Sequence, residues 1–311
     1  MTMKPTRDGY GEALLYLGEH NPDVVVMDAD VAKSTRTDWF WKQYPDRFFD
    51  MGISEQDMLG TAAGLSLGGK IPFVSTYGVF LAGRAWDQIR TTVCYTNLNV
   101  KLGGAHGGIS VGPDGATHQS LEEIALMRVI PNMQLIVPCD AIETRKATIA
   151  AASIPGPVYL RFAREATPII TKEEDEWVFG KASRLRAGTD LTIIACGPIV
   201  AEAMMAADEL AKQGISARVV NMHTIKPLDA EAILAAAKET GAIVTAEEHQ
   251  VNAGLGGAVA EVVVKHHPVP VEMVGVMDTF GESGTADELM QAYGLTAKDI
   301  LAAAKRALDR K

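Results

Sequence analysis

The sequence predicts an α/β protein of two consecutive domains, each with a mostly parallel sheet flanked by helices. Short runs rich in valine and isoleucine alternate with longer helical patterns over most of the 311 residues. Such alternation is typical of strand–helix–strand units, whose strands lie parallel. The alternation lapses between Ala166 and Gly188, where "TPIITKEEDEW" is charged and aperiodic, and then restarts. We therefore expect a linker there and a second sheet after it.

The first half contains five expected strands, each short and apolar along most of its length. Strands covered by helices on both faces show such runs instead of a strict alternation. They lie at 23–29, 71–75, 99–104, 134–138 and 157–161, and the helical patterns between them at 8–20, 55–69, 79–93, 120–129 and 142–152. The pattern at 55–69, "EQDMLGTAAGLSLGG", is small and apolar all round, which predicts a buried helix.

The second half repeats this order with no internal sequence repeat. Strands are expected at 190–196, 216–222, 242–247 and 271–276, and helices at 200–214, 230–241 and 257–267, with two more at the end of the chain. "GLGGAV", at 254–259, lacks the third glycine of a dinucleotide-binding fingerprint. We interpret it as close helix packing and not as a nicotinamide site. His266 and His267 are expected at an exposed helix end.

Composition narrows the class of partner and the compartment. The net charge is −10 and no long basic run occurs, which argues against nucleic acid or an anionic membrane as the main partner. No apolar run reaches the length of a membrane span, and the first residues lack the apolar core of a signal peptide. Three cysteines, far apart and without a CxxC motif, predict buried thiols. We therefore expect a cytoplasmic protein.

One glycine-rich loop concentrates residues with chemistry. "GGAHGGISVGPDGATHQ", at 103–119, holds six glycines together with His106, Asp114 and His118. It follows a predicted strand, and ligands of open α/β sheets bind at the carboxyl ends of strands. Zinc is one alternative, although the spacing matches no known zinc site and no cysteine is near. Neutral histidines and a carboxylate suit a hydroxylated substrate better.

Glu55 and two aromatic residues form a second candidate group. Glu55 opens the predicted helix 55–69, either as an ordinary first-turn carboxylate with Ser54 as N-cap, or as a partly buried acid for a ligand nitrogen. Tyr77 and Phe80, three residues apart, either pack in the core or form a flat wall for an aromatic ligand.

Two arginines follow the last strand of the first half. Arg161 and Arg164 stand close together in "YLRFARE", so one is expected to face away from the loop as a salt-bridge partner. The other can clamp a phosphate or carboxylate.

Four stretches, in order along the chain, resemble the C-terminal half of transketolase. They are "FDMGISEQDM", "PFVSTYGVFLAGRAWDQIR", "GISVGPDGATHQSLEEIALMRVIPNMQLIVPCD" and "FGESGTADELMQAYGLT". The GISEQ and GxDGxTHQ motifs are typical of transketolases and of the related deoxyxylulose-phosphate synthases. The resemblance implies a transketolase pyrimidine-binding domain at 1–172, a linker at 173–188 and a transketolase C-terminal domain at 189–311.

The resemblance also implies a missing partner. Full-length transketolases have a further N-terminal domain, which holds the diphosphate of thiamine diphosphate and its Mg²⁺ or Ca²⁺ through a GDG motif. No GDG occurs here. We therefore expect the C-terminal subunit of a split transketolase, which shares thiamine diphosphate with an N-terminal partner subunit in a heterotetramer of two plus two chains. It would transfer a two-carbon ketol unit from a ketose phosphate to an aldose phosphate, with pentose-pathway sugars as the default.

Matching positions imply roles for individual residues. Glu55 corresponds to the catalytic glutamate that hydrogen-bonds the aminopyrimidine nitrogen, and Tyr77 and Phe80 to aromatics that pack on that ring. The usual third aromatic is Gly83 here. Asp30, in "MDADVAKS", corresponds to an aspartate near the cofactor and the subunit contact.

The remaining matches concern the substrate. Asp114 corresponds to a carboxylate that binds a sugar hydroxyl, and His118 to a catalytic histidine near the reacting hydroxyls. The expected ligands of the sugar phosphate are Arg7, Ser34, His106 and Arg164. The loop departs from the family pattern at Gly107, Pro113 and Ala116, which leaves the donor and acceptor sugars open.

Three alternatives remain at this stage. One is an activity like that of deoxyxylulose-phosphate synthase, a family that normally uses one long chain. Another is the β subunit of a 2-oxo-acid dehydrogenase, which is similar in size but lacks the DGATHQ-type loop. A third is a non-catalytic subunit that only completes an assembly.

Overall fold

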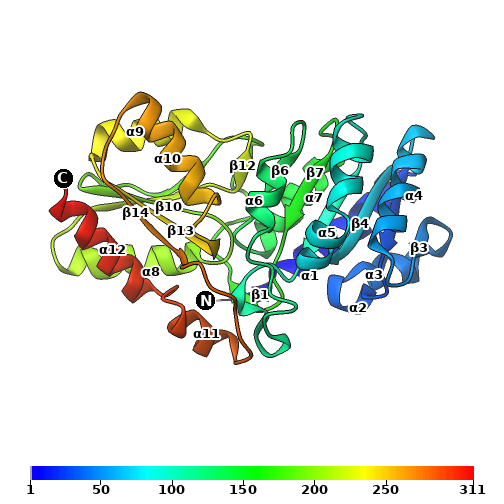
Figure 1. Cartoon of the computed structure of the whole chain (residues 1–311), viewed down its shortest axis with the longest axis horizontal. Helices are drawn as coiled ribbons and strands as arrows, with labels where there is room; N and C mark the ends of the chain where they lie inside the picture. Colours follow the sequence, from blue (N-terminus) through cyan, green and yellow to red (C-terminus); the bar gives the residue numbers. More distant parts are fainter. Residues whose placement is uncertain (1) are drawn as a thin grey trace.

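The computed structural model describes residues 2–311 and consists of two α/β lobes that lie side by side (Figure 1). The first lobe has a seven-stranded sheet in the order β12–β6–β7–β5–β4–β2–β3, parallel except for β12. The second has a five-stranded sheet in the order β14–β13–β10–β11–β9, parallel except for β9. The predicted fold class is confirmed.

Most strands of the first sheet lie in apolar stretches of the chain, although β5 and β12 each contain a lysine. They are β2 (Val24–Asp28), β3 (Phe48–Asp50), β4 (Ile71–Tyr77), β5 (Lys101–Ala105), β6 (Gln134–Ile136), β7 (Val158–Arg161) and β12 (Thr224–Lys226). Two short strands, β1 (Met3–Pro5) and β8 (Ala166–Pro168), pair antiparallel beside this sheet.

Helices cover both faces of the first sheet. One face packs against α1 (Thr6–His20), α3 (Thr37–Gln43) and α7 (Ala141–Ala151). The other packs against α4 (Glu55–Leu67), α5 (Gly78–Arg84) and α6 (Glu123–Arg128). The predicted single helix over 79–93 is wrong in its middle. α5 ends at Arg84, and a π-helical segment, Gln88–Cys94, follows. Between them, the indole of Trp86 donates to the carbonyl of Leu126.

The second sheet is built in the same way. Its strands are β9 (Ser183–Arg186), β10 (Leu191–Ala195), β11 (Ala217–Asn221), β13 (Ile243–Gln250) and β14 (Val271–Val276). α8 (Val200–Lys212) and α12 (Ala297–Asp309) cover one face, and α9 (Ala230–Thr240) and α10 (Leu255–His266) the other. α11 (Ala286–Ala292) instead reaches the glycine-rich loop of the first lobe.

The two lobes share structure across their boundary. β12 comes from the second half of the chain but pairs with β6 of the first sheet. One core cluster runs through both lobes, from Leu135 and Val137 to Ile194 and Val220. β9 lies inside the segment expected as a linker, 173–188, and pairs with β11. The domain limits at 172 and 189 stay predictions.

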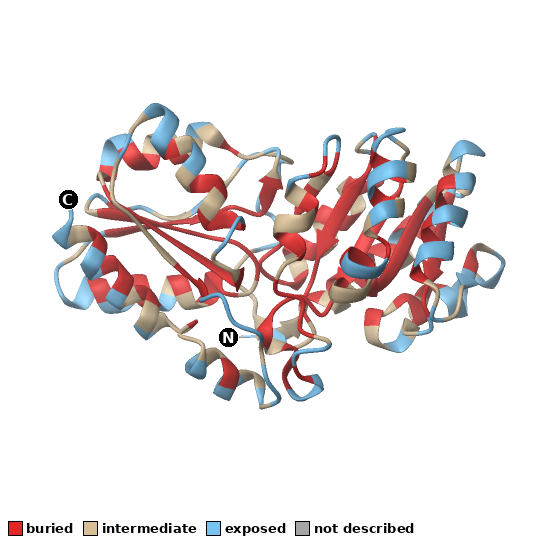
Figure 2. Ribbon diagram, in the orientation of Figure 1, coloured by how far each residue is buried: buried red, intermediate tan, exposed pale blue. Residues whose placement is uncertain are grey.

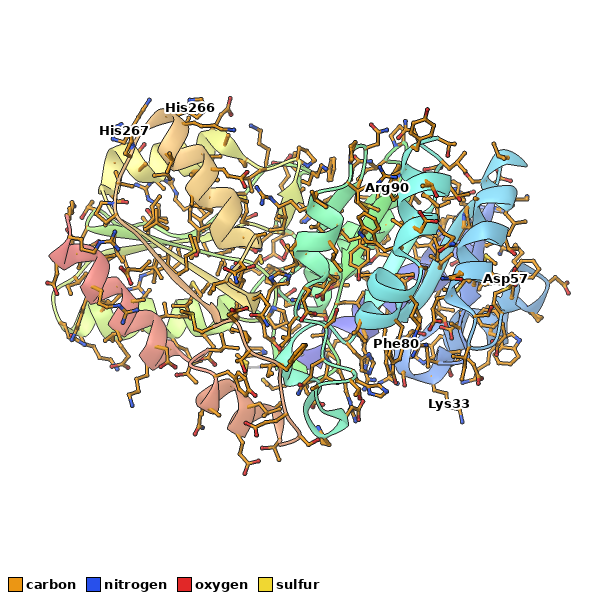
Figure 3. The ribbon with its side chains drawn as sticks, in the orientation of Figure 1. Lys33, Asp57, Phe80, Arg90, His266 and His267 are labelled. Atoms are coloured by element: carbon orange, nitrogen blue, oxygen red, sulfur yellow. The ribbon has the colours of Figure 1, made fainter. Side chains whose placement is uncertain are left out.

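The sheets are the most buried elements, and one helix is more exposed than the sequence predicted. Figure 2 shows the strands buried along most of their length and the helices exposed on their outer faces. α4 was expected to be buried all round. That expectation is wrong for this chain on its own, because Gln56, Asp57, Gly60, Thr61 and Gly64 form an exposed face. Asp57 is labelled on the outer side of the lobe in Figure 3.

Two smaller expectations can be compared with the structure. Cys94, Cys139 and Cys196 are free and buried, as predicted. His266 ends α10 and is exposed, and it is labelled with His267 at the edge of the molecule in Figure 3. No helix within residues 2–311 is both long enough and apolar enough to cross a membrane.

Candidate active site

The site begins where the strand order of the first sheet reverses. After β2 the chain passes over one face through α3 to β3, and from β3 it crosses the other face through α4 to β4, on the opposite side of β2. Ligands of open α/β sheets bind outside the carboxyl ends of strands at such a reversal. Ser34 follows β2, Tyr77 ends β4 and His106 follows β5, so the topology gathers these residues at one edge.

The turn that carries Ser34 is held by a buried carboxylate. Asp28 accepts hydrogen bonds from the amide of Val31 at 2.6 Å and from the hydroxyls of Thr35 and Thr37 at 2.7 and 2.8 Å. Burial raises the pKa of Asp28 to about 6, although these donors act in the opposite direction. The carboxylate thereby fixes the α2 turn (Ala32–Thr35), on which Ser34 lies.

Tyr77 joins this turn to the glycine-rich loop. Its hydroxyl donates to Oγ of Ser34 at 3.1 Å, and its ring stacks on His106 with 4.2 Å between centroids. The ring of Phe80 stacks beside that of Tyr77 with 5.7 Å between centroids, and the rings of Phe80 and His118 meet edge to face with 5.2 Å between centroids. The two aromatics therefore form one wall with both loop histidines, not separate core contacts.

His106 is buried and held neutral. It is 1% exposed, its φ of 59° lies in the left-handed region, and its Nδ1 atom has no hydrogen-bond partner among residues 2–311. Burial lowers the pKa of His106 to about 3, and Arg7 and Arg164 add to the effect. A strained backbone and an unpaired buried nitrogen both cost free energy, which is typical of a residue kept for function.

The four expected phosphate ligands lie together. The guanidinium of Arg7 donates to the carbonyl of Ser34 at 3.2 Å. The positive charges of Arg7 and Arg164 both lower the pKa of His106. The charge of Arg36 also lowers the pKa of His106, and Arg36 forms an ion pair with Asp8 at 2.6 Å. Sequence reasoning missed Arg36, because nothing in the pattern of its segment distinguishes it from a surface arginine.

Arg161 and Arg164 diverge, as their spacing predicts. Arg164 lies 3.2 Å from Oδ1 of Asp114 and donates to the carbonyl of Val111 at 3.2 Å. Arg161 is buried on the other side and pairs with Glu123 at 2.5 Å. Asp114 is exposed and His118 is partly exposed. The loop thus presents a carboxylate and an imidazole beside the arginine cluster.

Glu55 lies at the other end of the aromatic wall. Its side chain is only 4% exposed, and its Oε1 atom is 3.0 Å from the guanidinium of Arg84, which lies 3.8 Å from the Phe80 ring centre. Figure 3 labels Phe80. Ser54 occupies the N-cap position, but within the described chain its side chain makes no capping hydrogen bond. Arg84 was missed, although its position four residues after Phe80 on one helix could have indicated the contact.

Two further expectations receive less structural context. Asp30 is exposed at the carboxyl end of β2, with a φ of 62°, and hydrogen-bonds to no other residue that the structure describes. Across residues 2–311, no three of the histidines, cysteines and carboxylates gather closely enough to hold a metal ion. The zinc alternative for the loop therefore finds no support.

Comparison with known proteins follows the same division of the chain. The transketolase pyrimidine-binding domain matches residues 2–169, and the transketolase C-terminal domain matches residues 180–300. The subunit SqwH of the 6-deoxy-6-sulfo-D-fructose transketolase of Clostridium sp. (strain MSTE9) is 45% identical, over 98% of this chain and 95% of the relative. One of the subunits of the apulose-4-phosphate transketolase of Phocaeicola vulgatus is 41% identical, over 94% of each chain.

A solved structure is similar over almost the whole chain. It is described as a split-gene transketolase in the form of an inactive β4 tetramer. The identity is 51%, the TM-score is 0.93, and 99% of each chain is covered.

The buried state of His106 leads to a prediction. The imidazole should stay neutral from pH 8 down to pH 4.5, because burial lowers its pKa to about 3. Between its ordinary pKa of 6.5 and about 3, only the unfolded chain binds this proton. His106 therefore lowers the free energy of unfolding as pH falls through that range. Nitrogen-15 NMR of histidine-labelled protein, assigned with His106→Gln, measures this. Protonation near pH 6.5 would contradict the prediction.

Proposed function

Because this chain belongs to the transketolase family, we propose that it is the C-terminal subunit of a split, thiamine-diphosphate-dependent transketolase. In this role it takes part in transferring a two-carbon ketol unit from a ketose phosphate to an aldose phosphate. One observation carries the proposal. A buried carboxylate and an aromatic wall, Glu55 with Tyr77 and Phe80, adjoin a cluster of arginines around a neutral histidine. The first group suits an aminopyrimidine, and the second suits a phosphate.

The chain's own residues fit the pyrimidine end of thiamine diphosphate. The cofactor supplies the nucleophilic thiazolium carbon that accepts the two-carbon unit and passes it on. Tyr77 and Phe80 give the pyrimidine ring a flat apolar surface, and Glu55 can hydrogen-bond a ring nitrogen. At Gly83, where the family has a third aromatic, an added Cβ would meet no described atom within 4 Å. The wall is therefore open on that side, with space for a ring.

The diphosphate end finds no such residues here. The described chain holds no cluster of metal-binding side chains, and the sequence has no GDG motif. We assign the diphosphate and its Mg²⁺ or Ca²⁺ to an N-terminal partner subunit. The relatives named as subunits and the split-gene neighbour support this division. A heterotetramer of two plus two chains, with Asp30 close to the subunit contact, would have the closed two-fold symmetry that is common among soluble oligomers.

The arginine cluster and the loop together would hold the sugar. Arg7 and Arg164 can form charge-assisted hydrogen bonds to phosphate, and Ser34 and His106 can complete the oxygen shell. Asp114 and His118, both on the loop, would bind hydroxyls between the phosphate and the reacting carbon. Holding both ends fixes the carbonyl for attack. The sugar itself stays open, since one relative is named for a sulfo sugar and another for apulose 4-phosphate.

The first experiment tests the assignment directly. We expect the purified chain alone to show no ketol transfer and to bind thiamine diphosphate weakly, because it lacks a diphosphate site. Mixing with a GDG-bearing N-terminal transketolase subunit from the same organism should give activity and a two-fold assembly, measured by a coupled assay and analytical ultracentrifugation. Turnover by this chain alone would refute the split-subunit assignment. A mixed complex inactive on every ketose phosphate and on hydroxypyruvate would refute the function.

A second prediction concerns Glu55. Glu55→Gln in the assembled enzyme should reduce kcat by about 100- to 10,000-fold, the usual contribution of a general acid–base group. The amide keeps the shape and one acceptor but loses the acid. Glu231→Gln, an exposed carboxylate in the first turn of α9, is the control and should be fully active. Near-normal kcat for Glu55→Gln would mean that Glu55 only stabilises the start of its helix.

A third prediction separates phosphate binding from the rest of the site. Arg164→Ala should raise KM for phosphorylated sugars by about 10- to 150-fold, from roughly 1.5–3 kcal/mol for a hydrogen bond to a charged group. Use of hydroxypyruvate, which has no phosphate, should barely change. Arg145→Ala is the control. Arg145 lies on α7, and its removal breaks only a surface ion pair with Glu173. An equal loss on both donors would assign Arg164 to the fold or the cofactor.

A further inference from the structure

The glycine-rich loop of the first lobe rests on the second lobe. We call residues 107–119 the substrate loop. Ile109 is fully buried, and together with Leu121, just after the loop, it belongs to the core cluster of the second lobe, beside Val244 and Ala246 of β13. The amide of Gln250 donates to the carbonyl of Leu121 at 2.9 Å. Both ends of the loop are thus anchored in a core to which its own sheet does not belong.

Glu248, on β13, holds the beginning of the loop. Its buried carboxylate accepts a hydrogen bond from the amide of Ser110 at 2.6 Å. A Cβ at Gly108, whose φ is 98°, would lie 2.1 Å from that carboxylate. Only glycine both adopts this backbone and leaves room for the carboxylate. One glycine of the motif is therefore required by the second lobe and not by a ligand.

The segment 281–284, "GESG", holds the end of the loop. We call it the GESG segment. The side-chain amide of Gln119 donates to the backbone carbonyl of Glu282 at 2.9 Å and to that of Ile109 at 3.2 Å. A Cβ at Gly281 would lie 1.9 Å from Oε1 of Gln119, and one at Gly115 would lie 2.6 Å from Oγ of Ser283. Figure 1 shows the chain before α11 beside the loop.

These contacts explain a motif that the proposed function leaves without a role. The stretch "FGESGTADELMQAYGLT" resembles transketolase as closely as the loop does, yet none of its residues is among the expected ligands. We propose that the second lobe positions the substrate loop, with Gln119, Glu248 and the GESG segment as the positioning residues for Asp114 and His118. The inference rests on the proposed function only in so far as the loop binds sugar.

The first test needs no activity. Gly281→Ala places a methyl group against Gln119, and Gln119→Met keeps the side-chain length but removes both donors. Hydrogen–deuterium exchange of the purified chain should show faster amide exchange in 107–120 for each variant, with α1 and β4 unchanged. Gly257→Ala is the matched control, since its Cβ would approach nothing closer than 3.9 Å. Exchange in 107–120 equal to wild type in both variants would overturn the proposal.

The second test uses the assembled enzyme. In Gly281→Ala and Gln119→Met, kcat/KM for sugar phosphates should fall by up to about 100-fold, the cost of a reactant misplaced by about an ångström. Discrimination between ketose epimers should fall as well. Affinity for thiamine diphosphate should change much less than kcat/KM. Glu55 and Phe80 lie on α4 and α5 and Tyr77 ends β4, so only their contact with His118 involves the loop. Unchanged epimer discrimination together with weakened cofactor binding would overturn the positioning role. A wild-type complex without ketol transfer would refute the proposed function and leave the exchange test valid.

Discussion

The arrangement of the site depends on one buried guanidinium between the two lobes. Arg161 donates to the carboxylate of Glu123 at 2.5 Å and to the carbonyls of Ser120 and Glu248 at 3.2 and 2.7 Å. Burial acts to lower the pKa of Arg161, but the neighbouring carboxylates hold it above its ordinary value. Removing one partner of such a buried pair typically costs about 3–5 kcal/mol. A Cβ at Gly107 would lie 2.6 Å from this guanidinium. Gly107 is therefore required at the start of the loop, because the guanidinium that joins the lobes leaves no room for a side chain.

The site is locally positive, although the chain as a whole is acidic. The chain as a whole is acidic, with a net charge of −10, yet Arg7, Arg36 and Arg164 gather around one histidine. Such a local reversal of sign attracts an anionic substrate and raises its concentration at the site. The same arginines help to keep His106 neutral, so its imidazole offers a hydrogen bond without adding a further charge. Asp28 acts locally, where its carboxylate fixes the turn that carries Ser34.

The sequence predicted the fold well where elements are long and apolar, and less well elsewhere. Every strand with a run of several aliphatic residues was found. β1, β3, β8, β9 and β12 were missed because none of them contains a run of aliphatic residues, and their pairing depends on distant parts of the chain. Local pattern suggested Glu55 and the loop histidines only as candidates, and their roles came from family resemblance. Arg36 and Asp28 could not be predicted, since each acts through contacts that only the folded chain brings together. Arg84 was missed although its spacing from Phe80 on one helix contains a signal for their contact.

The exposed face of α4 bears on the proposed division of the enzyme into subunits. On this face, Gly60 and Gly64 have no described atom within 4 Å of an added Cβ. Glu55 opens this helix, and its neighbour Arg84 is 46% exposed at the side chain. A partner subunit that covers this face would remove water from Arg84 and from the carboxylate together. Electrostatic interactions strengthen as water is excluded, so under the proposed function the pairing of Glu55 with Arg84 would strengthen on assembly. Activity of the proposed split enzyme would then depend on assembly through the surroundings of one carboxylate, in addition to the missing diphosphate site.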